Sequence, residues 1–90
     1  MPIMRCVYLL RSIRDPSKRY IGMTDNLEHR LAEHNAGRSP HTARCAPWEV
    51  VVAIHFADAR RAEAFERYLK HGSGHAFARR HFWQHTAPTA

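Results

Sequence analysis

The run from Trp48 to Phe56 constrains the fold of this chain more than any other segment. Its letters are WEVVVAIHF, and β-branched and aromatic side chains of this kind favour extended backbone. The run is therefore the clearest strand in the sequence, and it implies a sheet. Because most of its side chains are apolar, we expect it to be the central strand.

Two shorter strands are predicted before this run. Residues Met4 to Leu10 alternate between two faces, and Arg19 to Met23 are rich in side chains that favour β structure. The segment from Ser12 to Lys18, with its Asp15-Pro16 step, contains turn-forming residues. Strand, loop and strand predict an antiparallel hairpin.

A first helix is predicted after the hairpin. Asp25 is a candidate N-cap, and Glu28, three residues later, completes a capping box, so the helix should run from there to about Asn35. Gly37 ends it. The polar segment from Ser39 to Pro47 contains two prolines and is predicted to be a loop.

Two further helices are predicted at the C-terminal end. Asp58 caps a helix over Ala59 to His71, and Gly72-Ser73-Gly74 separates it from a short helix over His75 to Trp83. The order is β-β-α-β-α-α. It predicts an α+β fold in which a three-stranded antiparallel sheet is flanked by helices.

Length and charge limit the organisation and the partner. Ninety residues suffice for one domain, which we place at residues 1–85, with 86–90 as a flexible tail. Fourteen Lys and Arg against eight Asp and Glu give a net charge of +6, which attracts polyanions. Nucleic acid is therefore the expected partner class, although charge alone equally fits a merely basic, soluble protein.

Cysteine spacing and hydropathy indicate a compartment. Cys6 and Cys45 form neither a CxxC pair nor a disulfide framework, so reduced thiols are expected. No apolar run is long enough for a membrane span, and the N-terminus lacks the pattern of a signal peptide. We expect a cytoplasmic protein that does not enter a membrane. The histidine spacing gives no clear ligand pair beyond His71/His75 and His81/His85, and without a CxxC motif structural zinc is not expected.

Polar residues encroach on the apolar face of the first predicted helix. On a helical wheel Arg30 and His34 fall in the same sector as Leu27 and Leu31. An Arg and a His in this sector could belong to a functional site. The alternative is that both extend from the rim of the face to solvent.

The second predicted helix repeats this anomaly. Ala62, Phe65 and Leu69 form its apolar stripe, and Glu66 lies at the margin of the same face. A carboxylate in such a place needs a cation nearby, either an Arg or a metal ion. A purely structural ion pair is the alternative.

Two tyrosines complete the candidate site. Tyr8 and Tyr20 could be cross-strand neighbours on one sheet face, near Arg30 and His34. Gly22 would leave open space beside Tyr20 and allow a close approach of backbone. Two strand tyrosines are, however, often ordinary core residues.

These segments together resemble the GIY-YIG nuclease superfamily. Cys6-Val7-Tyr8 and Tyr20-Ile21-Gly22 resemble its paired motifs, Thr24 to Gly37 its first helix, and Ala62 to Lys70 its metal-binding helix. The similarity extends over residues 4 to 83. His41-Thr42, Pro47-Trp48 and the segment from Gly72 to Ala78 are similar to a small stand-alone bacterial branch, related to an excinuclease subunit.

The resemblance implies a metal-dependent endonuclease that acts on nucleic acid, DNA rather than RNA, in repair or processing. Glu66 would hold one Mg²⁺ or Mn²⁺ ion, and Arg30 would bind the scissile phosphate. Tyr8 is our preferred general base, with Tyr20 and His34 assisting or replacing it. Gly22, Arg38 and Lys70 are expected to contact nucleic acid.

Two departures from the family pattern bear on activity. Cys6 and Val7 replace the Gly and Ile of the first motif, which leaves the tyrosine in place. Many members have an asparagine late in the domain, but this chain has none after Asn35. Its support for the metal or phosphate is then either dispensable or supplied by another residue, such as Ser73 or His81. A non-catalytic nucleic-acid-binding module is therefore the main alternative, and a basic protein adaptor the third. The oligomeric state is not indicated.

Overall fold

The computed structural model describes residues 5–83 and has the element order that the sequence predicts. Three strands, β1 (Arg5–Ser12), β2 (Arg19–Thr24) and β3 (Trp48–Phe56), form one antiparallel sheet. The helices are α1 (Leu27–Asn35), α2 (Ala59–Lys70) and α3 (Gly72–Ala78), with a short 3₁₀ turn at Ala43–Cys45 and a π-helical turn at Arg79–Trp83. The predicted α+β fold is confirmed. The expected tail at residues 86–90 lies outside the described residues.

The strand order is β2-β1-β3, so the prediction that Trp48–Phe56 is central was wrong. The central strand is β1, whose segment from Cys6 to Leu10 is buried on both faces. In β3 most side chains are only half-buried or exposed. Apolar composition did not distinguish the two strands, because an edge strand that packs under a helix also carries apolar side chains.

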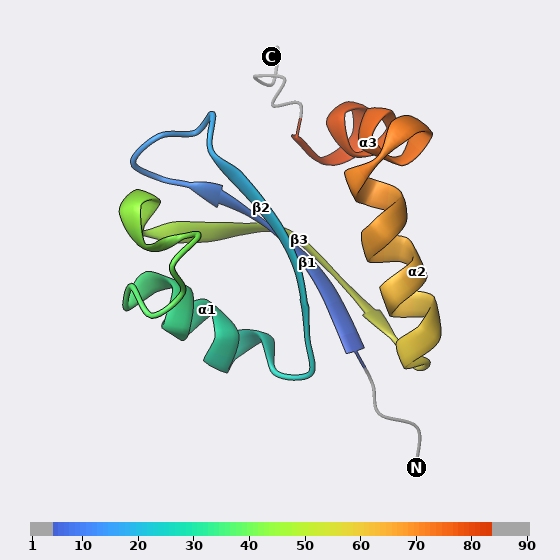
Figure 1. Cartoon of the computed structure of the whole chain (residues 1–90), viewed down its shortest axis with the longest axis horizontal. Coiled ribbons are helices and arrows are strands. Elements are labelled where there is room, and N and C mark those ends of the chain that lie inside the picture. The colour runs from blue at the N-terminus through green and yellow to red at the C-terminus, as the bar shows by residue number, and fades with distance from the viewer. Residues whose placement is uncertain (1–4, 84–90) are drawn as a thin grey trace, which may run out of the picture.

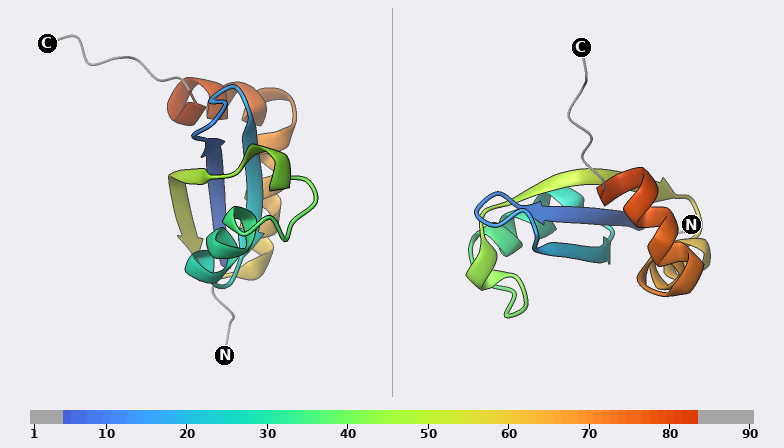
Figure 2. Two further views of the ribbon diagram at one scale, coloured as in Figure 1. Left: turned by 90° about the vertical axis from the view of Figure 1, so that its left-hand side faces the viewer. Right: turned by 90° about the horizontal axis from the view of Figure 1, so that it is seen from above.

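Helices cover both faces of the sheet, as Figures 1 and 2 show. On one face Val7 and Leu9 pack with Ala62 and Leu69 of α2. On the other face lie Cys6, Tyr8, Leu10 and Trp48, covered by Leu27 and Leu31 of α1. The alternation of β1 therefore divides the interior into two layers, and the tyrosine belongs to the α1 layer.

Helix boundaries differ from the predictions at two places. Asn26, not Asp25, caps α1, because its side chain accepts a hydrogen bond from the backbone N–H of His29. The predicted break at Gly72-Ser73-Gly74 lies one residue earlier, at the extended residue His71, and α3 begins with the glycines. Gly74 must be glycine because an added Cβ would collide with the backbone of Tyr68. Asp58 caps α2 as predicted.

Both cysteines are free thiols, as expected. Burial raises the pKa of the Cys6 thiol, which keeps it protonated and unreactive. Across residues 5–83 no helix is both long and apolar enough to cross a membrane.

Candidate active site

The strands place the two tyrosines on the same face of the sheet. Tyr8 lies opposite Gly22 and Leu10 lies opposite Tyr20, so the tyrosines are diagonal neighbours. Their ring centroids are 6.1 Å apart. The predicted proximity of Tyr8 and Tyr20 is confirmed.

Gly22 does not leave open space, contrary to the prediction. A Cβ added to Gly22 would lie 2.5 Å from the Tyr8 hydroxyl oxygen and 2.8 Å from Cε2 of Tyr20. Both rings therefore cover the bare Cα. The glycine is required by the tyrosine pair itself, since any side chain would displace the Tyr8 hydroxyl.

His34 of α1 completes an aromatic cluster with these tyrosines. It is fully buried, and its Nε2 lies 2.9 Å from the Tyr8 hydroxyl. Its ring meets Tyr20 edge to face, with centroids 4.8 Å apart. His34 thus faces inward, as the helical wheel predicted, and does not extend to solvent.

A third residue, Thr42, fixes the orientation of the imidazole. The Thr42 hydroxyl lies 2.7 Å from Nδ1 of His34 and donates its proton to the Ser39 carbonyl at 3.4 Å. Its oxygen can then only accept from Nδ1–H, which leaves Nε2 as an acceptor. We therefore assign the Tyr8 hydroxyl as the donor to His34.

Thr42 was not among the predicted site residues, although the sequence contains a signal for it. A buried imidazole has two ring nitrogens to satisfy, and the loop after α1 is the nearest source of a hydroxyl. Trp48 holds this loop in place, because its indole N–H donates to the Thr42 carbonyl at 2.8 Å. The 3₁₀ turn and the start of β3 thus support the site from behind.

Burial favours the neutral form of both partners. It raises the pKa of Tyr8 to about 12, an effect increased by Tyr20 and opposed by the positive charge of Arg30. Burial also lowers the pKa of His34 below its ordinary 6.5, and the charge of Arg30 lowers it further. At neutral pH the pair is a phenol donating to an uncharged imidazole.

Arg30 lies at the edge of this cluster. Its side chain is about one third exposed, at 33%, and it forms an ion pair with Glu33 at 3.2 Å. Its effect on the pKa of Tyr8 and of His34 means that its charge acts on both groups. Arg30 therefore has one side toward the buried cluster and another toward solvent.

Glu66 and Lys70 belong to α2, on the opposite side of the sheet. Glu66 is partly buried, its side chain 22% exposed, and it pairs with Lys70 at 3.5 Å. The predicted need for a cation is met by this lysine. In the part of the chain that the structure describes, no hydrogen bond or ion pair joins Glu66 to the tyrosine cluster.

A pocket at the free edge of β2 connects the two sides. It has a volume of about 350 Å³ and is lined by Arg19, Tyr20, Ile21, Lys70, His75 and Trp83. Because β2 is an edge strand, successive side chains reach this pocket from both faces of the sheet. Tyr20 from the α1 side and Lys70 from the α2 side thus share one opening. His75 was not among the predicted site residues.

The residues fit a magnesium-type site better than a zinc site. Residues 5–83 contain no group of three or more His, Cys, Asp or Glu side chains placed to hold a metal. Zinc requires such a set, whereas Mg²⁺ retains water and often binds one or two carboxylates together with substrate phosphate. Glu66, partly buried and next to the β2 pocket through Lys70, is a carboxylate of that kind.

Other expected residues lie elsewhere. Arg38 lines a separate depression against α1, together with His29, Ala32, Glu33 and Ala36. Ser73 and His81 line another, with Tyr68 and Phe77. Neither depression includes a residue of the tyrosine cluster, so the proposed replacement of the late asparagine by Ser73 or His81 has no support from the geometry.

Comparison with known proteins identifies the family. The GIY-YIG catalytic domain matches residues 4–80, which include the tyrosine pair, α1 and Glu66. The chain belongs to the GIY-YIG family. The matched range contains all the candidate site residues described above: Tyr8, Tyr20, Arg30, His34 and Glu66.

Relatives of this GIY-YIG domain include fungal structure-specific endonuclease subunits SLX1. The protein of Talaromyces marneffei is 38% identical over 77 residues, 79% of this chain and 20% of the relative. That of Podospora anserina is 40% identical over 72 residues, 73% and 21% of the two chains. That of Candida dubliniensis is 33% identical over 87 residues, 90% and 29%.

Two points follow from these relatives. They are fungal endonuclease subunits and not the bacterial excinuclease-related branch that the sequence suggested, so that finer assignment is corrected. The chain also spans only about a fifth of the length of the first two relatives. The similarity therefore concerns only one part of each of these longer relatives.

Proposed function

We propose that this GIY-YIG domain is a metal-dependent endonuclease that hydrolyses phosphodiester bonds in nucleic acid, and that DNA is its substrate. The observation that carries the proposal is the buried Tyr8–His34–Thr42 chain of hydrogen bonds, with Arg30 beside it. Any buried phenol needs a hydrogen-bond acceptor, but an acceptor that can also take up a proton, next to a guanidinium, suits proton transfer. The names of the fungal relatives support an endonuclease that selects its substrate by structure.

In this proposal the proton of the attacking water moves along the hydrogen-bond chain. The water gives a proton to the Tyr8 oxygen while the Tyr8 proton passes to Nε2 of His34, and the resulting hydroxide attacks phosphorus. The bond from phosphorus to the leaving oxygen then breaks, and that oxygen takes a proton from solvent. The proton on His34 returns to solvent through Tyr8, since burial and the charge of Arg30 disfavour the imidazolium. Because the pKa of Tyr8 is about 12, its phenol keeps its proton at neutral pH. Tyr8 can therefore act as a base only if His34 accepts the phenol proton.

Charge stabilisation falls to the cations at the edges of the cluster. Arg30 is permanently charged and forked, which suits two oxygens of one phosphate. Glu66 would hold a Mg²⁺ or Mn²⁺ ion, and the ion would supply positive charge to the phosphate oxygens. Lys70, in its ion pair with Glu66, would then be released toward the substrate. Tyr20, in the shared pocket, would contact the phosphate or the water.

The alternative is a module that binds nucleic acid without cleaving it. The missing late asparagine favours this alternative. The close packing of the tyrosine pair over Gly22 and the fixed orientation of His34 favour catalysis. Arg38 stays a predicted contact to nucleic acid, whereas Gly22 is buried under the two tyrosine rings and is not placed to make one. The cytoplasmic location and a role in DNA repair or processing stay predictions.

The test is a cleavage assay on labelled single-stranded, duplex and branched DNA and on RNA, with Mg²⁺, Mn²⁺ or EDTA. We expect metal-dependent cleavage that falls by about 10²- to 10³-fold in Glu66→Gln. The matched control is Glu63→Gln, an exposed glutamate on the same helix, which should cleave like wild type. Equal activity of wild type and Glu66→Gln on every substrate would contradict the proposal of a metal-dependent enzyme in which Glu66 holds the ion. Binding by wild type without cleavage would establish the module.

A further inference from the structure

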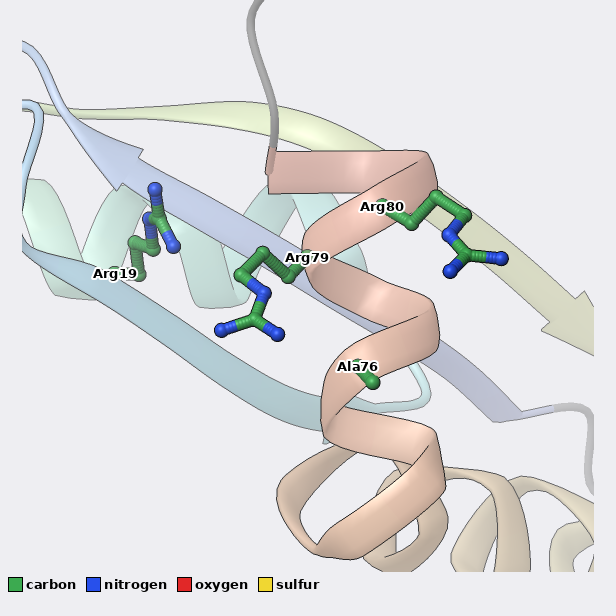
Figure 3. Close-up of a pocket in the computed structure, with 4 residues that line it drawn as sticks. All are labelled: Arg19, Ala76, Arg79 and Arg80. Carbon is green, nitrogen blue, oxygen red and sulfur yellow. The ribbon is translucent and has the colours of Figure 1, made fainter.

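The edge of β2 carries a second basic pocket next to the one that contains Tyr20. It has a volume of about 430 Å³ and is lined by Arg19, Ala76, Arg79 and Arg80. Arg19 lines both pockets, so they adjoin at this residue. Figure 3 shows Arg19 on β2 and Arg79 on the C-terminal helical segment projecting into the same gap, with Arg80 pointing away from them. Three of the four residues that line this pocket are arginines.

Within residues 5–83 these arginines have no acidic partner. In residues 5–83 the carboxylates that form ion pairs are Glu33, Glu49 and Glu66, and none of them pairs with Arg19, Arg79 or Arg80. The remaining residues, 1–4 and 84–90, contain no Asp or Glu. Guanidinium groups that share a pocket without a carboxylate repel one another. An anion in the pocket would relieve that repulsion.

Arg19 is held in place although its surroundings are unfavourable. It lies directly opposite Arg11 in the β1–β2 register, and like charges in that position destabilise a sheet. Arg11 is compensated by its ion pair with Glu49 at 3.1 Å. Arg19 is instead placed over the ring of the buried Trp83, with its Cζ 5.2 Å from the centroid. The aromatic ring thus orients the guanidinium without neutralising it.

We infer that Arg19 and Arg79 form a second phosphate site that binds the nucleic-acid backbone beside the scissile phosphate. The inference rests on the proposed nuclease function. The chemistry is that of two forked cations on a phosphodiester, which positions the strand but reads no base. A strand whose reacting phosphate lies near Tyr20 and Lys70 continues past Arg19, because that residue lines both pockets.

The experiment measures binding of labelled single-stranded and duplex DNA by fluorescence anisotropy over a salt series, in EDTA to prevent cleavage. Wild type is compared with Arg79→Gln, Arg19→Gln, the double variant and Arg79→Lys. The matched control is Arg61→Gln, an exposed arginine in the first turn of α2, away from the pocket. Thermal unfolding of each variant checks folding, which matters most for Arg19 because of its contact with Trp83.

We expect each single pocket variant to reduce the slope of log Kd against log salt by about one, and the double variant by about two. Arg79→Lys should keep the slope, because it keeps the charge. If Arg79→Gln and Arg61→Gln reduce the slope of log Kd against log salt equally, binding comes from the overall positive charge of the protein. The proposed phosphate site would then not exist. Cleavage by wild type in that case leaves the nuclease proposal intact, whereas wild type that neither binds nor cleaves refutes both.

Discussion

At the scale of single residues, the site depends on which ring nitrogen of His34 carries the proton. Tyr8 can donate to Nε2 only while Nδ1–H is held by the Thr42 hydroxyl. Helical periodicity placed His34 on the inner face, but it did not identify this hydroxyl, which comes from a loop eight residues later. A catalytic role for the histidine thus depends on a residue outside its own helix.

Replacing Thr42 tests this dependence. Thr42→Val keeps the shape but removes the acceptor, so we expect unfolding free energy to fall by about 1–3 kcal/mol and kcat to fall about tenfold or more. Thr42→Ser keeps the hydroxyl and should retain both. The tautomer of His34, read from ¹⁵N chemical shifts by NMR, should change in Thr42→Val alone. An unchanged tautomer and unchanged kcat in Thr42→Val would exclude the assigned chain of hydrogen bonds.

At the scale of elements, the last residue of α1 is hydrogen-bonded to the sheet, in addition to the packing of Leu27 and Leu31 and the His34–Tyr8 contact. The Asn35 side-chain oxygen accepts from the backbone N–H of Trp48 at 2.6 Å, and its amide donates to the carbonyl of the same residue at 3.3 Å. This pair of hydrogen bonds joins the side chain of the last residue of α1 to the backbone of the first residue of β3. It keeps His34, the preceding residue, against Tyr8.

Loss of this attachment should lower both stability and activity. For Asn35→Ala we expect the free energy of unfolding in urea to fall by about 1–3 kcal/mol, because the Trp48 N–H loses its acceptor. Asn35→Asp keeps an acceptor and should lose less. The neighbouring exposed residue Ala36 offers a control, and Ala36→Ser should be close to wild type. If Asn35→Ala unfolds at the wild-type urea concentration, the attachment contributes nothing measurable.

At the scale of the whole molecule, the buried Tyr8–His34 pair makes stability depend on pH at both ends. The pKa of His34 is lowered in the fold, so the unfolded chain binds its proton more readily, and stability falls as pH drops below about 6.5. The pKa of Tyr8 is raised from 10.0 to about 12, so the unfolded chain loses its proton first, and stability falls as pH rises through that window.

Chemical denaturation over a pH series measures the loss of unfolding free energy at both ends of the pH range, the acid limb and the alkaline limb. The Tyr8 shift corresponds to a loss on the order of 2–3 kcal/mol between about pH 10 and 12. Tyr8→Phe should remove this alkaline loss, and His34→Gln should weaken the acid one. Tyr68→Phe is the matched control, since Tyr68 is 42% exposed and lies outside the cluster. An alkaline limb of the same size in Tyr8→Phe and Tyr68→Phe would contradict burial as its cause.

The sequence by itself determined the element order and the two-layer alternation of β1, because these follow from the periods of strand and helix. It placed His34 in the apolar sector of its helix, and the structure decided that the side chain faces inward. It also indicated the family, since several separated motifs agreed. Only the tertiary structure decided that β1 is central, that Tyr8 fills the space over Gly22, and that Thr42 orients His34. The physical reason is that strand order, the packing of rings over a Cα and partners from distant loops depend on long-range contacts, which local periodicity does not encode.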